Sequence, residues 1–117
     1  RMPTSPLRGF NRCSIDELIS EGIEMVYCPS LIKKNYWGLW MYDECIIKIN
    51  PNLIHRHGKA IEDFVIVHEL LHSYEDMILT LSTDFRETQI DWWAQYHLNR
   101  DQDIANYMRS FFSEQGF

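Results

Sequence analysis

The segment of residues 68–72, His-Glu-Leu-Leu-His, has the residue types and spacing that metal-assisted hydrolysis requires. Residues four apart on a helix project from the same face, so His68 and His72 can direct two imidazole nitrogens at one Zn²⁺ ion. Glu69 lies beside them and stays free to act as the general base that takes a proton from the attacking water. Chance alone gives this pattern in about one chain in a few hundred of this length. The segment therefore predicts a catalytic zinc centre.

A catalytic zinc site needs a third protein ligand and one open position. Glu75 and Asp76 follow on the same helix as the histidines, too far along it to close on the same ion. We therefore expect the third ligand to come from the next helix, where Glu87 is the best candidate. Asp91, four residues later, would accept a hydrogen bond from the outer N–H of a ligand histidine and fix its tautomer.

Other roles for these side chains stay open. Asp84 and Glu87 have the spacing of an N-terminal helix cap, in which Glu87 would reach back to a backbone amide. His97, later on the same helix, is a rival ligand, although a histidine on an apolar stripe is more often a hydrogen-bonded core residue. His55 and His57 precede the motif in an expected loop, where solvated histidines are the common case.

The pattern of apolar residues predicts the elements that must position these groups. Alternation predicts three strands, at residues 23–28, 36–42 and 45–50. A period of three to four residues predicts the helix that carries the motif and two further helices, at residues 60–81, 85–98 and 102–112. We expect an α+β fold, in which a small three-stranded, mostly antiparallel sheet packs on the motif helix. The strand at 45–50 is a candidate edge for an extended peptide.

The first part of the chain gives two further expectations. Residues 1–12 contain proline, glycine and scattered arginine, and we expect a loosely ordered arm there. A short helix should follow over residues 15–21, because Ser14 and Glu17 have capping-box spacing and Gly22 suits the position after its end.

Bulk composition limits the class of protein. A chain of 117 residues is enough for a single domain with one core. Its formal net charge of −6 argues against direct binding of nucleic acid. An odd set of three cysteines without a CxxC pair predicts reduced thiols in a reducing compartment. No apolar run is long enough to span a bilayer, so we expect a cytoplasmic protein without a membrane partner.

With its elements in this order, the sequence resembles the ImmA/IrrE family of metallopeptidases over residues 15–98. The family's HELGH or HELAH motif corresponds to residues 68–72, and its I-x-I-N strand end corresponds to residues 47–50. A second-helix pattern, E-x-x-A-N-x-F-A-x-x-L-L, corresponds to residues 87–98. The resemblance implies a minimal zincin-like fold of the gluzincin type and limited proteolysis of a specific intracellular protein, with a helix-turn-helix repressor as the candidate substrate.

The resemblance also implies a role for each matching residue. His68, His72 and Glu87 would be the zinc ligands, Glu69 the catalytic base, and Asp91 the partner of a ligand histidine. The chain departs from the family pattern where larger residues replace small ones, at Leu71 and Ile90, and where Asn99-Arg100 replaces a Met-Pro pair.

Two other hypotheses share the same ligands. One is a regulatory or binding module that keeps zinc without catalytic turnover, and it differs from the enzyme only in having no need for Glu69. The other is a phage-encoded or secreted protease effector, which the cysteines fit equally well.

Overall fold

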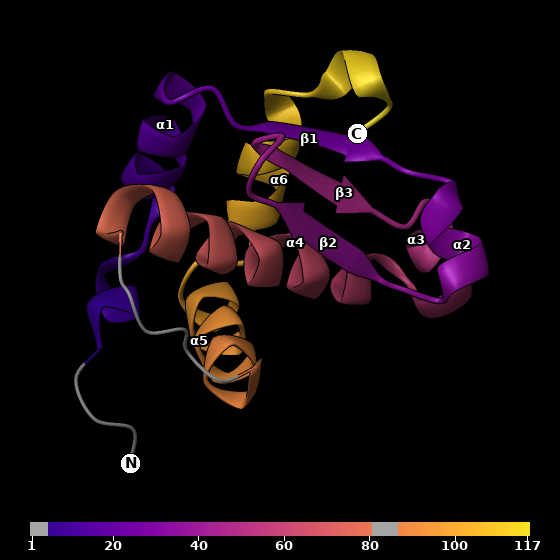
Figure 1. Ribbon diagram of the computed structural model, residues 1–117. Helices are drawn as coiled ribbons and strands as arrows, with labels where there is room; N and C mark the ends of the chain where they lie inside the picture. Colours follow the sequence, from indigo (N-terminus) through magenta and orange to yellow (C-terminus); the bar gives the residue numbers. More distant parts are fainter. Residues whose placement is uncertain (1–4, 81–86) are drawn as a thin grey trace.

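A computed structural model describes residues 5–80 and 87–117 and has an α+β architecture (Figure 1). After a 3-10 turn, residues 12–49 of the described chain form α1 (Arg12–Ser20), β1 (Glu24–Tyr27), α2 (Ser30–Lys34), β2 (Gly38–Met41) and β3 (Ile46–Ile49). The second half is helical: α3 (Leu53–His57), α4 (Lys59–Tyr74), α5 (Glu87–Arg100) and α6 (Ile104–Ser110). The three predicted strands and the motif helix are therefore confirmed as elements.

The sheet is mixed, so the expectation of a mostly antiparallel sheet is wrong. Its strand order is β1-β3-β2, with β3 parallel to β1 and antiparallel to β2. The short turn after β2 brings β3 back as its antiparallel neighbour, and β3 then lies between β2 and β1. Because β3 is paired on both sides, it cannot accept a peptide as an added strand. The edge strands are β1 and β2, and β2 packs beside α4.

The core joins one face of this sheet to the helices. Ile47 and Ile49 alternate with half-buried positions on β3 and are fully buried in one apolar cluster with residues of α4. In Figure 1, α4 runs along the sheet, and α5 packs against α4 on the side away from the strands. Leu71 and Ile90, the two larger residues in the family comparison, are fully buried, so the core accommodates both.

The start of the described chain is ordered, which corrects the expectation of a loose arm over residues 5–12. The side chain of Ser5 caps a 3-10 turn at Pro6–Gly9. Leu7 and Phe10 are buried in the core, and the Leu7 carbonyl oxygen lies 2.7 Å from Nε2 of His97. Two apolar side chains therefore anchor a segment whose composition is typical of a flexible terminus. Residues 1–4 lie outside the described part of the chain.

The start of α1 differs from the prediction, because the capping residue is not the predicted Ser14. Asn11 is the N-cap of α1, and Ser14 is the third helical residue of its capping box, so α1 begins three residues early. Gly22 has a φ of +96° just beyond the end of α1, as predicted.

Three other segments also differ from the prediction. Residues 53–57, expected as a loop, form α3, and α6 begins at Ile104. After α4, the chain continues into a π-helical turn at Glu75–Leu79. The expected start of a helix at residue 85 lies outside the described residues.

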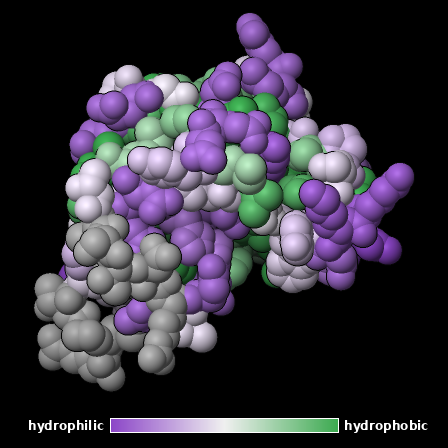
Figure 2. Space-filling view, viewed as in Figure 1, coloured by the Kyte–Doolittle hydropathy of each residue, from purple (hydrophilic) through white to green (hydrophobic). Residues whose placement is uncertain are grey.

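The surface is mainly hydrophilic on the face shown in Figure 2, with smaller apolar areas between the polar ones. Within the described parts of the chain, no helix combines the length and the apolar character needed to cross a bilayer.

Candidate metal centre

The two histidines of the motif point at one place. They lie one turn apart on α4, and their Nε2 atoms are 3.2 Å apart. Glu87, on the first described turn of α5, contacts both rings: Oε2 lies 2.8 Å from Nε2 of His68, and Oε1 lies 3.1 Å from Nε2 of His72. One possible ligand atom from each residue lies within 4.8 Å of the other two. Two helices thus bring together the three residues predicted as zinc ligands.

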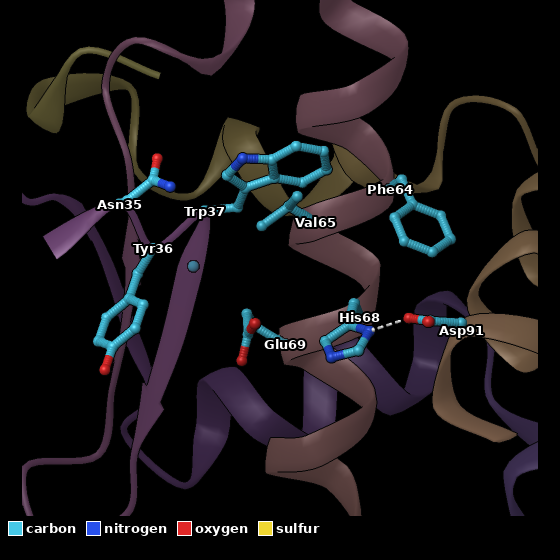
Figure 3. A pocket seen from close by; sticks show the side chains of 9 residues that line it. Asn35, Tyr36, Trp37, Phe64, Val65, His68, Glu69 and Asp91 are labelled. Carbon is cyan, nitrogen blue, oxygen red and sulfur yellow. Dashed lines mark ion pairs between the residues drawn. The ribbon is translucent and has the colours of Figure 1, made fainter. Parts of the chain in front are cut away.

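Asp91 lies one turn after Glu87 and contacts the other side of the His68 ring. Its Oδ1 is 2.8 Å from Nδ1 of His68, so Nδ1–H donates to the carboxylate (Figure 3). This hydrogen bond selects the tautomer whose Nε2 lone pair is directed at the three-residue cluster. The structure therefore pairs Asp91 with His68, one of the two histidines predicted as ligands.

The donor set fits a cation. With its proton on Nδ1, neutral His68 has only a lone pair on Nε2, yet that atom faces a carboxylate and a second imidazole at 2.8 and 3.2 Å. Such atoms repel one another unless a shared proton or a metal ion lies among them. The pKa of His68 is lowered, mainly because the ring is buried and also because His72 lies beside it. The negative charges of Glu87 and Asp91 act in the opposite direction but are outweighed. A neutral imidazole is the form that binds metal, and two imidazoles with one carboxylate are ligands that zinc accepts.

Glu69 is buried between the cluster and the sheet. Its side chain points from α4 toward β2, while His68 points toward Asp91 (Figure 3). Burial, and then the negative charge of Glu87, raise the pKa of Glu69 to about 8. A cation among the neighbouring ligands would act in the opposite direction and favour the carboxylate. Glu69 is thus a buried carboxyl group whose charge would depend on what the cluster holds.

Strand β2 comes close to Glu69 at Gly38. A Cβ atom on Gly38 would lie 2.6 Å from Cγ1 of Val65 and 3.2 Å from Cγ and Oε2 of Glu69. Real Cβ atoms do not approach other atoms to 2.6 Å. The glycine therefore allows the strand to pass next to the general-base candidate.

A cleft between β2 and α4 opens onto the cluster. It has two adjacent hollows, of about 430 and 360 Å³, which share Gly38, His68 and Glu69 as walls. The larger hollow extends past Trp37 and Phe64, and the smaller one includes His72 and Glu87 among its walls. A molecule that filled both hollows would contact Glu69 and the His68, His72 and Glu87 cluster together.

The free edge of β2 borders the same cleft. The backbone N–H of Asn50 donates to the carbonyl oxygen of Trp37 at 2.9 Å, which sets the phase of the β2–β3 ladder. Because backbone groups alternate in direction along an antiparallel strand, Gly38 and Trp40 direct theirs away from β3. Sequence reasoning missed Gly38 and Trp37, since no local signal marks a close approach of strand and helix.

The remaining histidines lie outside the cluster. His97 is buried, and its Nε2 donates to the Leu7 carbonyl oxygen. His55 and His57 are exposed on α3, where the His57 ring lies 5.0 Å from that of Trp37. The alternative cap role for Glu87 involves Asp84, which lies outside the described residues.

Comparisons with known proteins give no independent assignment. No family model, no curated protein and no solved structure matches this chain at a significant level. The family resemblance of the motif and the second helix therefore stays a prediction.

Proposed function

We propose that this protein is a zinc-dependent metallopeptidase that hydrolyses a peptide bond in a specific intracellular protein. The observation that carries the proposal is the convergence of His68, His72 and Glu87 from two helices next to a buried, uncoordinated glutamate. A purely structural zinc site is closed by four protein ligands, whereas three ligands and an open cleft are typical of catalytic ones.

The residues of the site would divide the work as follows. His68, His72 and Glu87 would hold the zinc ion, and Asp91 would keep the His68 ring in its binding tautomer. Zinc held by such ligands lowers the pKa of water to about 7 and polarises a carbonyl group. Glu69 would accept the proton of the attacking water on its carboxylate and then deliver it to the nitrogen of the departing amine.

The edge of β2 would hold the substrate in an extended conformation. Gly38 and Trp40 direct backbone groups to the free side of the strand, next to Glu69. A peptide hydrogen-bonded there as an added strand would lie along the cleft with its backbone next to the ligand cluster.

The resemblance supports a repressor protein as the substrate, and hence a cytoplasmic setting. Cys13, Cys28 and Cys45 are all free thiols, as expected in a reducing compartment. We propose neither a nucleic acid nor a membrane as a direct partner.

The test measures zinc and cleavage separately. We expect about one zinc per chain in the purified protein, a large loss of zinc in His72→Ala and Glu87→Ala, and none in Thr88→Ala, an exposed neighbour on the same turn. Glu69→Gln should keep zinc and fold but lose cleavage of a repressor encoded beside the gene, read by mass spectrometry. Cleavage by Glu69→Gln at the wild-type rate contradicts the general-base role. Zinc binding without cleavage of any bound neighbour favours the non-catalytic module.

A further inference from the structure

The larger hollow beside Glu69 has an aromatic lining. Trp37, directly before β2, reaches toward Val65, and Phe64 lies on the opposite side next to Asp91 (Figure 3). Tyr36 and Trp37 are 52% and 43% exposed, so solvent and ligands can reach both side chains beside the hollow. Large exposed aromatic groups around a hollow are typical of a binding site.

Hydrogen bonds from Asn50 fix the position of this lining. Its side-chain Nδ2 donates to the Tyr36 carbonyl oxygen at 2.9 Å, and its backbone N–H donates to that of Trp37 at 2.9 Å. Asn35 ends α2 with a φ of 58°, which turns the chain directly into the two aromatic residues. The backbone of this wall is therefore held in place before any ligand binds, which reduces the entropy lost on binding.

We propose that this pocket, formed by Tyr36, Trp37, Phe64 and Val65, binds a bulky apolar side chain of the peptide substrate next to the bond that is cut. The inference rests on the proposed function and adds a substrate class to it. The hollow shares His68 and Glu69 with the ligand cluster, so a side chain inside it places its own backbone beside those residues.

Size and charge select the class of side chain. A volume of about 430 Å³ accommodates one large side chain such as phenylalanine, tryptophan or leucine. Asp91 also lines the pocket, and its carboxylate opposes the entry of an acidic side chain. Substrates with aspartate or glutamate at this position are therefore disfavoured.

The test uses three peptides, Ac-Ala-Ala-Xaa-Ala-Ala-amide with Xaa as Phe, Ala or Asp. Dissociation constants are measured by calorimetry on zinc-loaded Glu69→Gln, and kcat/KM is measured on the zinc-loaded wild type. We expect the Phe peptide to bind at least about tenfold more tightly than the Ala peptide, with the Asp peptide weakest. Trp37→Ala and, independently, Phe64→Leu should reduce the preference for Phe to within about threefold.

Tyr42→Ala is the matched control, because Tyr42 is 64% exposed between β2 and β3 and does not line the pocket. It should keep the full preference. Equal binding of the Phe and Ala peptides to zinc-loaded Glu69→Gln overturns the inference. So does a preference for Phe that is unchanged in both Trp37→Ala and Phe64→Leu. Failure of the proposed function gives a different result: no peptide is cut, while the preference in binding and its loss in the pocket variants persist.

Discussion

Asp91 of α5 accepts a hydrogen bond from Nδ1 of His68 on α4, at 2.8 Å. The opposite nitrogen of the same ring lies 2.8 Å from Glu87, one turn earlier on α5. One helix therefore supplies both a candidate ligand and the group that orients a second ligand. The imidazole ring is held on two sides by carboxylates from a single neighbouring element.

Asp91→Ala is expected to weaken zinc binding by about 10- to 100-fold, because the ring of His68 loses its orientation and its fixed tautomer. Affinity is measured by competition with a chromogenic chelator. Gln95→Ala, one turn further along the same helix and exposed, is the control and should leave the affinity unchanged. Equal affinities in the two variants would show that the Asp91 contact has no influence on the metal.

Gly38→Ala should lower the free energy of unfolding by about 1–3 kcal/mol, since the added methyl group overlaps Cγ1 of Val65. Urea denaturation measures the change. The control is Gly9→Ala, where an added Cβ meets no atom within 4 Å. In the double variant Gly38→Ala/Val65→Ala, removal of the opposing methyl groups should make the loss smaller than the sum of the two single losses. Simple additivity would mean that the strand moves freely to accept the methyl group.

Arg109→Met is expected to destabilise the fold by about 3–5 kcal/mol, because it leaves the fully buried Glu62 without its cation. Arg109 Nη2 lies 2.9 Å from Oε1 of Glu62, and the hydroxyl of Tyr27 donates to the same carboxylate at 3.2 Å. Replacing both charges, in Glu62→Met/Arg109→Met, should restore more than half of the loss. A double variant as unstable as Arg109→Met would show that packing around the pair, rather than the unpaired charge, sets the cost.

His97 should make the protein less stable in mild acid. Burial lowers the pKa of His97 below its usual 6.5, against the opposing hydrogen bond to Leu7, and the charge of Arg100 lowers it further. The unfolded chain therefore takes up a proton first as the pH falls. The stability contributed by neutral His97 is complete above pH 6.5 and is lost as the pH falls through its lower folded-state value.

The glutamine in His97→Gln can still donate to the Leu7 carbonyl oxygen but does not titrate. Between pH 7 and 5, the free energy of unfolding should therefore fall less steeply in this variant than in the wild type. The two slopes should differ by up to about 1.4 kcal/mol per pH unit. Thermal unfolding at a series of pH values measures the difference. His55→Gln, at an exposed position on α3, should keep the wild-type slope. Parallel curves for wild type and His97→Gln would rule out this histidine as a source of acid sensitivity.

The candidate site was predictable where its signal is local. The four-residue spacings of His68 with His72, and of Glu87 with Asp91, indicate which side chains share a helix face, and helix geometry is the same in every context. The prediction that these two helix faces meet came from chemistry, because a zinc site needs a third protein ligand from a second element. The cluster of Glu87 with both histidines follows from combining the two.

The missing parts depend on contacts distant in sequence. Strand residues indicate that a sheet forms, but not that β3 lies between β1 and β2. Gly38 reads as an ordinary strand residue until Val65 is placed beneath it. Leu7 and Phe10 are only two apolar residues in a segment rich in proline and glycine, and their burial depends on the surface that α5 and the end of α4 provide.

The candidate ligands come from two helices, and this has a thermodynamic consequence. His72 and Glu87 meet only when α4 and α5 are docked, so a zinc ion held between them binds the folded chain and not the unfolded one. By mass action, free zinc at about 100 times its dissociation constant would add about 2.7 kcal/mol to the free energy of unfolding. The melting temperature would then rise with zinc concentration, and a cell depleted of zinc would hold less of this protein in its folded form.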